Sequence, residues 1–94
     1  MPVGMLAQLP GVNAEGYDSI MQHLEWDTKP KPDGFISHHA GPTANGWLVF
    51  DVWESQGDFE RFAQERLAPA MQGAFGEVPE MSPTFVPIHR EEHA

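Results

Sequence analysis

The chain has 94 residues and contains no cysteine. Disulfides, thiolate metal ligands and a cysteine nucleophile are therefore excluded. A cysteine-free chain also fits a reducing compartment. The first residues, MPVGMLAQLPG, lack the basic segment and long apolar run of a secretory signal. We therefore expect a cytoplasmic protein.

Positive charge is scarce. Five Lys and Arg residues stand against fourteen Asp and Glu residues, which gives a formal charge of −9. Nucleic-acid phosphates and anionic membrane surfaces would repel such a chain. No apolar run approaches the roughly 20 residues of a membrane span. We expect no nucleic-acid partner and no membrane partner.

Motifs for nucleotides and metals are also missing. The sequence has no Gly-x-Gly-x-x-Gly, no P-loop and no serine nucleophile elbow. His23, His89 and His93 are scattered along the chain, and His93 lies in the polar tail, so we do not expect them to form a metal site. We predict no metal site and no cofactor.

Apolar periodicity predicts six elements in the order strand, helix, strand, strand, helix, strand. Their expected bounds are 3–9, 14–26, 35–40, 47–53, 56–71 and 84–88, with a hairpin loop over 41–46. Asn13 is the expected N-cap of the first helix, and Ser55 with Asp58 resembles a capping box for the second. Pro69 predicts either a kink in that helix or the restart of a short turn. Pro83 and Pro87 predict that the last strand lies at an edge.

Segment 47–53 gives the strongest strand signal. Alternate residues of a strand point to opposite faces. One face carries three apolar residues, and the other carries Asp51 among apolar ones. The two sets are Leu48, Phe50 and Val52, and Trp47, Val49, Asp51 and Trp53. Because both faces are largely apolar, we expect the strand to be buried on both sides.

The order βαββαβ predicts a single α+β domain over residues 1–94 with the ferredoxin-like arrangement. Such a domain has a four-stranded antiparallel sheet with both helices on one face. The other face is bare in a monomer, and a bare apolar face must be covered. A second copy under two-fold symmetry is the simplest cover, so we predict a homodimer. The polar residues 90–94 are expected to form a flexible tail.

Three segments resemble a known family. The run from Asp51 to Phe59, followed by Arg61-Phe62, resembles the strand-to-helix junction of the dimeric α/β-barrel superfamily. It is most similar to the antibiotic-biosynthesis-monooxygenase-like branch. The segments 34–42 and 66–70 resemble small bacterial members of uncharacterised function. In this family the residues at Trp53, Ser55 and Phe59 close the third strand, cap the second helix and pack its first turn.

The resemblance spans Val3 to His89 and implies a dimeric α/β barrel. The superfamily includes cofactor-independent oxygenases of aromatic polyketides, isomerase-like enzymes, haem-degrading oxygenases and stress proteins. The haem-degrading branch has an asparagine in its first strand and an axial histidine in its second helix. Segments 3–9 and 56–71 contain neither. We therefore expect no tight haem binding.

His38 and Asp51 are the candidate catalytic residues. His38 and His39 are adjacent on a strand and must point to opposite faces. If the hairpin pairs Ala40 with Trp47, His38 shares a face with Asp51, whereas a one-residue shift would place His39 there instead. A histidine beside a carboxylate can act as a general base near neutral pH, with the carboxylate as its orienter. The alternative is a hydrogen-bonded structural histidine.

Five further residues are expected to bind substrate: Tyr17, His39, Trp47, Trp53 and Phe62. The indoles could form a stacking wall or simply fill the barrel. Together the residues and the resemblance predict a small-molecule pocket protein for an aromatic or polyketide-like metabolite. As an enzyme it would be a cofactor-independent monooxygenase, or an isomerase or cyclase. The alternative is a non-catalytic ligand-binding or stress-associated dimer, and the sequence does not decide between them.

Overall fold

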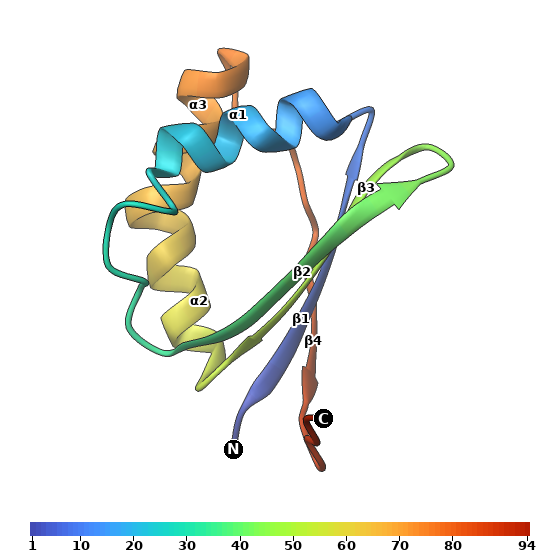
Figure 1. The fold of residues 1–94 in the computed structure, drawn as a ribbon, viewed down its shortest axis with the longest axis vertical. Coiled ribbons are helices and arrows are strands. Elements are labelled where there is room, and N and C mark those ends of the chain that lie inside the picture. The colour runs from blue at the N-terminus through green and yellow to red at the C-terminus, as the bar shows by residue number, and fades with distance from the viewer.

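A computed structural model describes residues 1–94 and shows one antiparallel sheet with its helices packed on one face (Figure 1). In chain order the elements are β1 (Val3–Pro10), α1 (Ala14–Leu24), β2 (Phe35–Thr43), β3 (Gly46–Trp53), α2 (Gln56–Phe62), a π-helical stretch η1 (Ala63–Leu67), α3 (Ala68–Phe75) and β4 (Thr84–Pro87). The strand order is β2-β3-β1-β4. The predicted α+β class and the βαββαβ order are confirmed, and β4 lies at an edge as its prolines predicted.

Both predicted helix caps are present. The Asn13 side chain accepts a hydrogen bond from the Gly16 N–H at 2.9 Å, and the Ser55 side chain accepts one from the Asp58 N–H at 3.1 Å. Helix α1 ends at Leu24 rather than at the predicted residue 26. Glu25 adopts a left-handed conformation with φ 54°, and its N–H bonds back to the Gln22 carbonyl. This reversal ends the helix.

The second helical segment is interrupted next to Pro69, where the sequence predicted a kink or a restart. Its middle turn is π-helical, with the Ala68 N–H bonded to the Ala63 carbonyl five residues earlier. Pro69 follows directly. It has no N–H to donate, and its ring crowds the carbonyl four residues before it. A widened turn relieves this crowding. The helix then continues past residue 71 and ends at Gly76, where φ is 77°.

The β2–β3 hairpin is tighter than predicted. The strands continue to Thr43 and from Gly46, which leaves a loop of Ala44 and Asn45 in place of the predicted loop 41–46. The edge position of β2 tolerates Pro42, because an edge strand needs hydrogen bonds on one side only.

The hairpin register also differs from the expected one. Ala40 pairs with Val49 rather than with Trp47. The shift is two residues, and side chains alternate with a period of two, so the faces are unchanged. His38 therefore lies on the same face as Asp51, as predicted, directly opposite it on the neighbouring strand.

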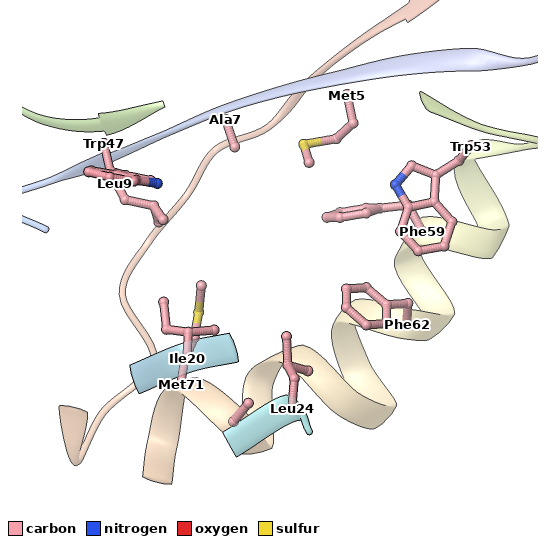
Figure 2. Close-up of a cluster of buried hydrophobic side chains, with 11 residues drawn as sticks. Met5, Ala7, Leu9, Ile20, Leu24, Trp47, Trp53, Phe59, Phe62 and Met71 are labelled. Carbon is pink, nitrogen blue, oxygen red and sulfur yellow. The ribbon is translucent and has the colours of Figure 1, made fainter. Parts of the chain in front are cut away.

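A single hydrophobic core lies between the sheet and the helices (Figure 2). Its eleven buried residues are Met5, Ala7, Leu9, Ile20, Leu24, Trp47, Trp53, Phe59, Phe62, Ala70 and Met71. None of the helices has the length and apolar character needed to cross a bilayer. Residues 90–94 form no helix or strand.

The opposite face of the sheet carries apolar side chains that this chain leaves partly exposed. Leu6 pairs with Phe50 on β3, and Gly4 pairs with Val86 on β4, so these residues share the face away from the helices. Leu6 is 39% exposed and Val86 is 52% exposed. The second face of β3 is only partly covered by this chain: Val52 is buried, whereas Leu48 and Phe50 stay partly exposed.

Gly34 is expected to be indispensable for the turn that leads into β2. Its φ is +82°, and a Cβ placed there would lie within 2.7 Å of the Asp58 Cβ. We predict that Gly34→Ala lowers the free energy of unfolding by about 1–3 kcal/mol, measured by chemical denaturation. Gly41→Ala is the control, because a Cβ there meets no atom within 4 Å. It is expected to change stability by less than about 0.5 kcal/mol. Equal effects of both variants would contradict this account of the turn.

Candidate functional site

The site is built around a buried carboxylate on β3. Asp51 is only 5% exposed. Its Oδ1 lies 2.6 Å from Nδ1 of His38, and its Oδ2 accepts a hydrogen bond from the Trp53 indole N–H at 3.1 Å. A buried carboxylate is costly unless donors satisfy it, and here both oxygens have one. The pair therefore fixes the imidazole ring in one orientation.

Tyr17 on α1 completes a line of four side chains. Its hydroxyl oxygen lies 2.5 Å from Nε2 of His38, and the planes of the two rings differ by only 3°. When Asp51 accepts the Nδ1 proton, Nε2 carries a lone pair and accepts the Tyr17 hydroxyl proton. The line runs from the helix through His38 to Asp51 and Trp53. It can therefore pass a proton between the Tyr17 end and the imidazole.

An apolar cavity lies beside this line. Its volume is about 50 Å³, and 14 of its 16 lining residues are hydrophobic. His38 and Asp51 are the two that are not. The other residues come from both layers, for example Met5, Ala7 and Val49 from the sheet and Ile20, Leu24 and Phe62 from the helices. Such a site places a histidine and its carboxylate partner in the wall of an apolar space.

The cavity wall can change shape. Four of the five methionines in the chain line it: Met5, Met21, Met71 and Met81. Methionine has a flexible, unbranched side chain that repacks around different shapes. At about 50 Å³ the space holds at most a few water molecules. An aromatic ligand therefore requires the methionine side chains to move.

Of the predicted site residues, some line the cavity and others do not. Tyr17, His38, Asp51 and Phe62 all line the cavity. Trp53 is fully buried and bonds to Asp51. Trp53 therefore supports the Asp51 carboxylate and does not line the cavity. Trp47 is likewise not part of the wall and packs against Tyr17, with ring centroids 5.1 Å apart.

His39 lies on the other face of the sheet, which corrects its expected place in this pocket. Its ring is next to Phe50, with centroids 6.4 Å apart. Neighbouring strand residues point to opposite faces, so only one of the two histidines can reach the cavity. In the observed β2–β3 register, His38 is the histidine that faces the cavity.

Trp26 lines the cavity but did not stand out from the sequence. It follows the left-handed residue that ends α1, and this reversal returns its ring to the core, edge-on to Phe35 and Phe62. The Lys31 ammonium lies 4.6 Å from the centre of the ring. The methionines meet at the cavity only in the folded chain. Their number in the sequence is a weak sign of an adaptable pocket, and their spacing along the chain does not predict that they meet.

Burial raises the pKa of the Tyr17 phenol above its ordinary value of 10.0, and the negative charges of Asp51, Asp18 and Asp27 raise it further. The phenol therefore remains a neutral proton donor toward His38 at neutral pH.

Tyr17 is the only tyrosine in the chain, so its ionisation can be followed alone by ultraviolet absorbance. We predict a midpoint above 10.0 in the folded protein. The unfolded state then loses this proton first as pH rises. The Tyr17 contribution to stability is complete below the unfolded pKa and is lost as pH rises through the folded pKa. Tyr17→Phe should remove this part of the alkaline loss of stability. A midpoint at or below the ordinary value would contradict the observed burial.

No group of three or more histidine, aspartate or glutamate side chains is placed to hold a metal ion. The ionisable groups at the cavity are the three of the Tyr17–His38–Asp51 line. The chemistry that the site itself offers is therefore hydrogen bonding and proton transfer.

Comparisons with known proteins agree with this fold. No family model and no curated protein matches the sequence. Solved structures do match. The cofactor-independent oxygenase SnoaB from Streptomyces nogalater is similar with a TM-score of 0.63 and 15% identity, over 96% of this chain and 95% of that chain.

Two other solved structures show the same likeness. A putative antibiotic biosynthesis monooxygenase from Deinococcus radiodurans has a TM-score of 0.60 and 14% identity, covering 100% of this chain and 98% of that one. A dimeric protein of unknown function with a ferredoxin-like fold from Bacteroides fragilis has a TM-score of 0.60 and 13% identity, over 93% and 96% of the two chains. The chain thus has the ferredoxin-like fold of the antibiotic-biosynthesis-monooxygenase-like proteins, as its residues had indicated.

Proposed function

We propose that the chain binds a small, planar hydrophobic molecule in this cavity and that His38 acts on it as a general base. The observation that supports this most is the His38–Asp51 pair. Nδ1 of His38 and Oδ1 of Asp51 are 2.6 Å apart, in a cavity wall that is otherwise almost entirely hydrophobic. An aromatic or polyketide-like metabolite fits the apolar lining, and its acidic hydroxyl or enolisable C–H fits the imidazole.

The reaction that this geometry serves best begins with proton transfer. His38 Nε2 takes a proton from the ligand, and Asp51 stabilises the imidazolium that forms. The ligand becomes an electron-rich anion in a water-poor site. For an isomerase or cyclase, the anion reacts internally, and the proton returns from Nε2 to a different atom.

An oxygenase would continue from the same anion. Dioxygen is then the oxidant that enters from solution. A CH₂ group of the ligand becomes a carbonyl, one oxygen atom enters the product, and the other leaves as water. The similarity in fold to SnoaB supports including this reaction in the proposal. No metal or organic cofactor is required by the steps assigned to His38 and Asp51.

The proposal includes a homodimer formed through the helix-free face of the sheet. That face exposes Leu6 and Val86, two of the four exposed large hydrophobic residues in the chain. A chain of this size buries only about 60–65% of its unfolded surface, so covering the face with a second copy adds stability. The dimeric ferredoxin-like protein from Bacteroides fragilis offers a precedent.

The experiment is a screen of the purified protein against phenols, quinones and polycyclic aromatic ketones, with and without oxygen. Consumption of a compound only with oxygen would identify an oxygenase. Conversion in both conditions would identify an isomerase or cyclase. A complete absence of binding would refute the proposed pocket.

Binding without catalysis is the second candidate, and one contact favours it. Nε2 of His38 is already engaged by the Tyr17 hydroxyl at 2.5 Å, so the base is occupied in the resting protein. A tightly bound compound that is recovered unchanged under both conditions would support this function.

A further inference from the structure

One buried donor has no partner in the protein. Among buried side-chain nitrogen and oxygen atoms, the indole nitrogen of Trp47 alone lacks a hydrogen bond. Trp47 is 9% exposed. An unpaired buried N–H costs free energy, and native proteins contain few of them. Neither the packing of Trp47 nor the proposed base explains why a tryptophan rather than a phenylalanine occupies this position.

The direction of this N–H points to the interior. Figure 2 shows the Trp47 nitrogen on the side of the ring that faces the centre of the core cluster. The other core tryptophan, Trp53, has its indole N–H bonded to Asp51. The two indoles of β3 thus differ. The N–H of Trp53 is hydrogen-bonded, and the N–H of Trp47 is not.

Tyr17 connects this donor to the base. Its hydroxyl contacts His38 Nε2 at 2.5 Å, while its ring packs on Trp47 with a tilt of 28°. Tyr17 is only partly buried and is carried by the surface helix α1, so its side chain has a route toward solvent. A ligand hydroxyl that takes its place on His38 would displace the phenol ring and come to lie against Trp47.

We infer that Tyr17 is an internal stand-in for the ligand, and that the ligand is a planar phenol or enol with a carbonyl oxygen that accepts the Trp47 N–H. The inference rests on the proposed function, and it specifies the class of compound. The hydroxyl replaces that of Tyr17 on His38. The acceptor is an uncharged carbonyl, because a second anion near Asp51 in an apolar site would be costly.

The test compares two probes that differ in one group, para-hydroxyacetophenone and para-ethylphenol. Both carry a phenol, and only the first has a carbonyl. The chain has three tryptophans and hence three indole N–H signals by NMR, and Trp47→Phe identifies the signal of Trp47. The Trp53 signal is the internal control, because its N–H is already bonded to Asp51.

We expect para-hydroxyacetophenone to bind about fivefold more tightly, which is the effect of one neutral hydrogen bond. It should move the Trp47 signal to lower field, whereas para-ethylphenol should leave that signal near its free position. Trp47→Phe should reduce the difference between the two affinities.

Two results would overturn the inference. Equal affinities with no shift of the Trp47 signal would refute the carbonyl contact and leave the proposed pocket intact. Failure of the wild-type protein to bind either phenol would refute both the inference and the pocket at His38. If Trp47→Phe folds poorly, the Trp47 signal is assigned in the wild-type protein from its through-space contacts with the Tyr17 ring, 5.1 Å away between centroids.

Discussion

Replacing Leu6 with aspartate is expected to convert the proposed dimer into a monomer at micromolar concentration. Leu6 lies on β1 between Phe50 and Thr84, near the middle of the helix-free face. Under two-fold symmetry the change buries two carboxylates in an apolar interface, and burying an unpaired ion costs several kcal/mol. The dimer dissociation constant should rise at least about a hundredfold. Light scattering of the wild type and the variant gives the two masses directly.

Val78→Asp is the matched control for this prediction. Val78 is 50% exposed and lies in the loop that follows α3, outside the sheet. The charge change is the same, and we expect the dimer to persist. A monomeric wild-type protein, or a dimer that survives Leu6→Asp, would show that the helix-free face is not the interface.

His38→Asn is expected to abolish most of the turnover of any substrate found in the screen. Asparagine can still donate a hydrogen bond toward Asp51, but it cannot accept a proton as a base. Loss of a general base typically lowers the rate by about 10²–10⁴-fold. Because Asp51 keeps a donor, the thermal midpoint should change little. Steady-state rates and thermal unfolding of the same sample give both values.

His38→Ala separates the catalytic role of His38 from its structural one. It leaves Asp51 with the Trp53 N–H as its single side-chain donor. An unsatisfied buried acceptor costs about 1–3 kcal/mol, and each kcal/mol lowers the midpoint of a domain of this size by about 4–8 °C. We expect the alanine variant to lose both stability and activity, and the asparagine variant to lose activity alone. Retained turnover in the asparagine variant would exclude His38 as the base.

Much of the fold could be predicted because local patterns and tertiary packing agree. Alternation in segment 47–53 and the stripe in segment 14–26 both match buried faces in the structure. The caps at Asn13 and Ser55 are local hydrogen bonds, so their residue types suffice to place them. The face of His38 was predicted despite a wrong register, because the error was two residues and not one.

The errors lie at the ends and turns of the elements, where the backbone departs from its regular pattern. The reversal at Glu25 shortens α1, and the π-helical turn before Pro69 has no periodic signature of its own. The two strands of the hairpin are longer than predicted. Gly41 and Pro42 favour a turn, but an edge strand tolerates both.

The site could be predicted only in part. The alternation of side chains on β3 and the hairpin suffice to predict that His38 and Asp51 share a face. Contact between Tyr17 and His38 depends on how α1 crosses the sheet, and that crossing is set by side-chain packing of the whole core. The unpaired N–H of Trp47 is equally invisible in the sequence, because every indole looks alike until its neighbours are known.

The most direct test of the proposed pocket is NMR mapping of a compound that binds in the aromatic screen. We predict the largest shifts at His38 and Tyr17, with further shifts at Val49 and the methionines of the cavity wall. A compound whose shifts lie on the helix-free face, around Leu6 and Phe50, and leave His38 and Tyr17 unmoved would contradict the account.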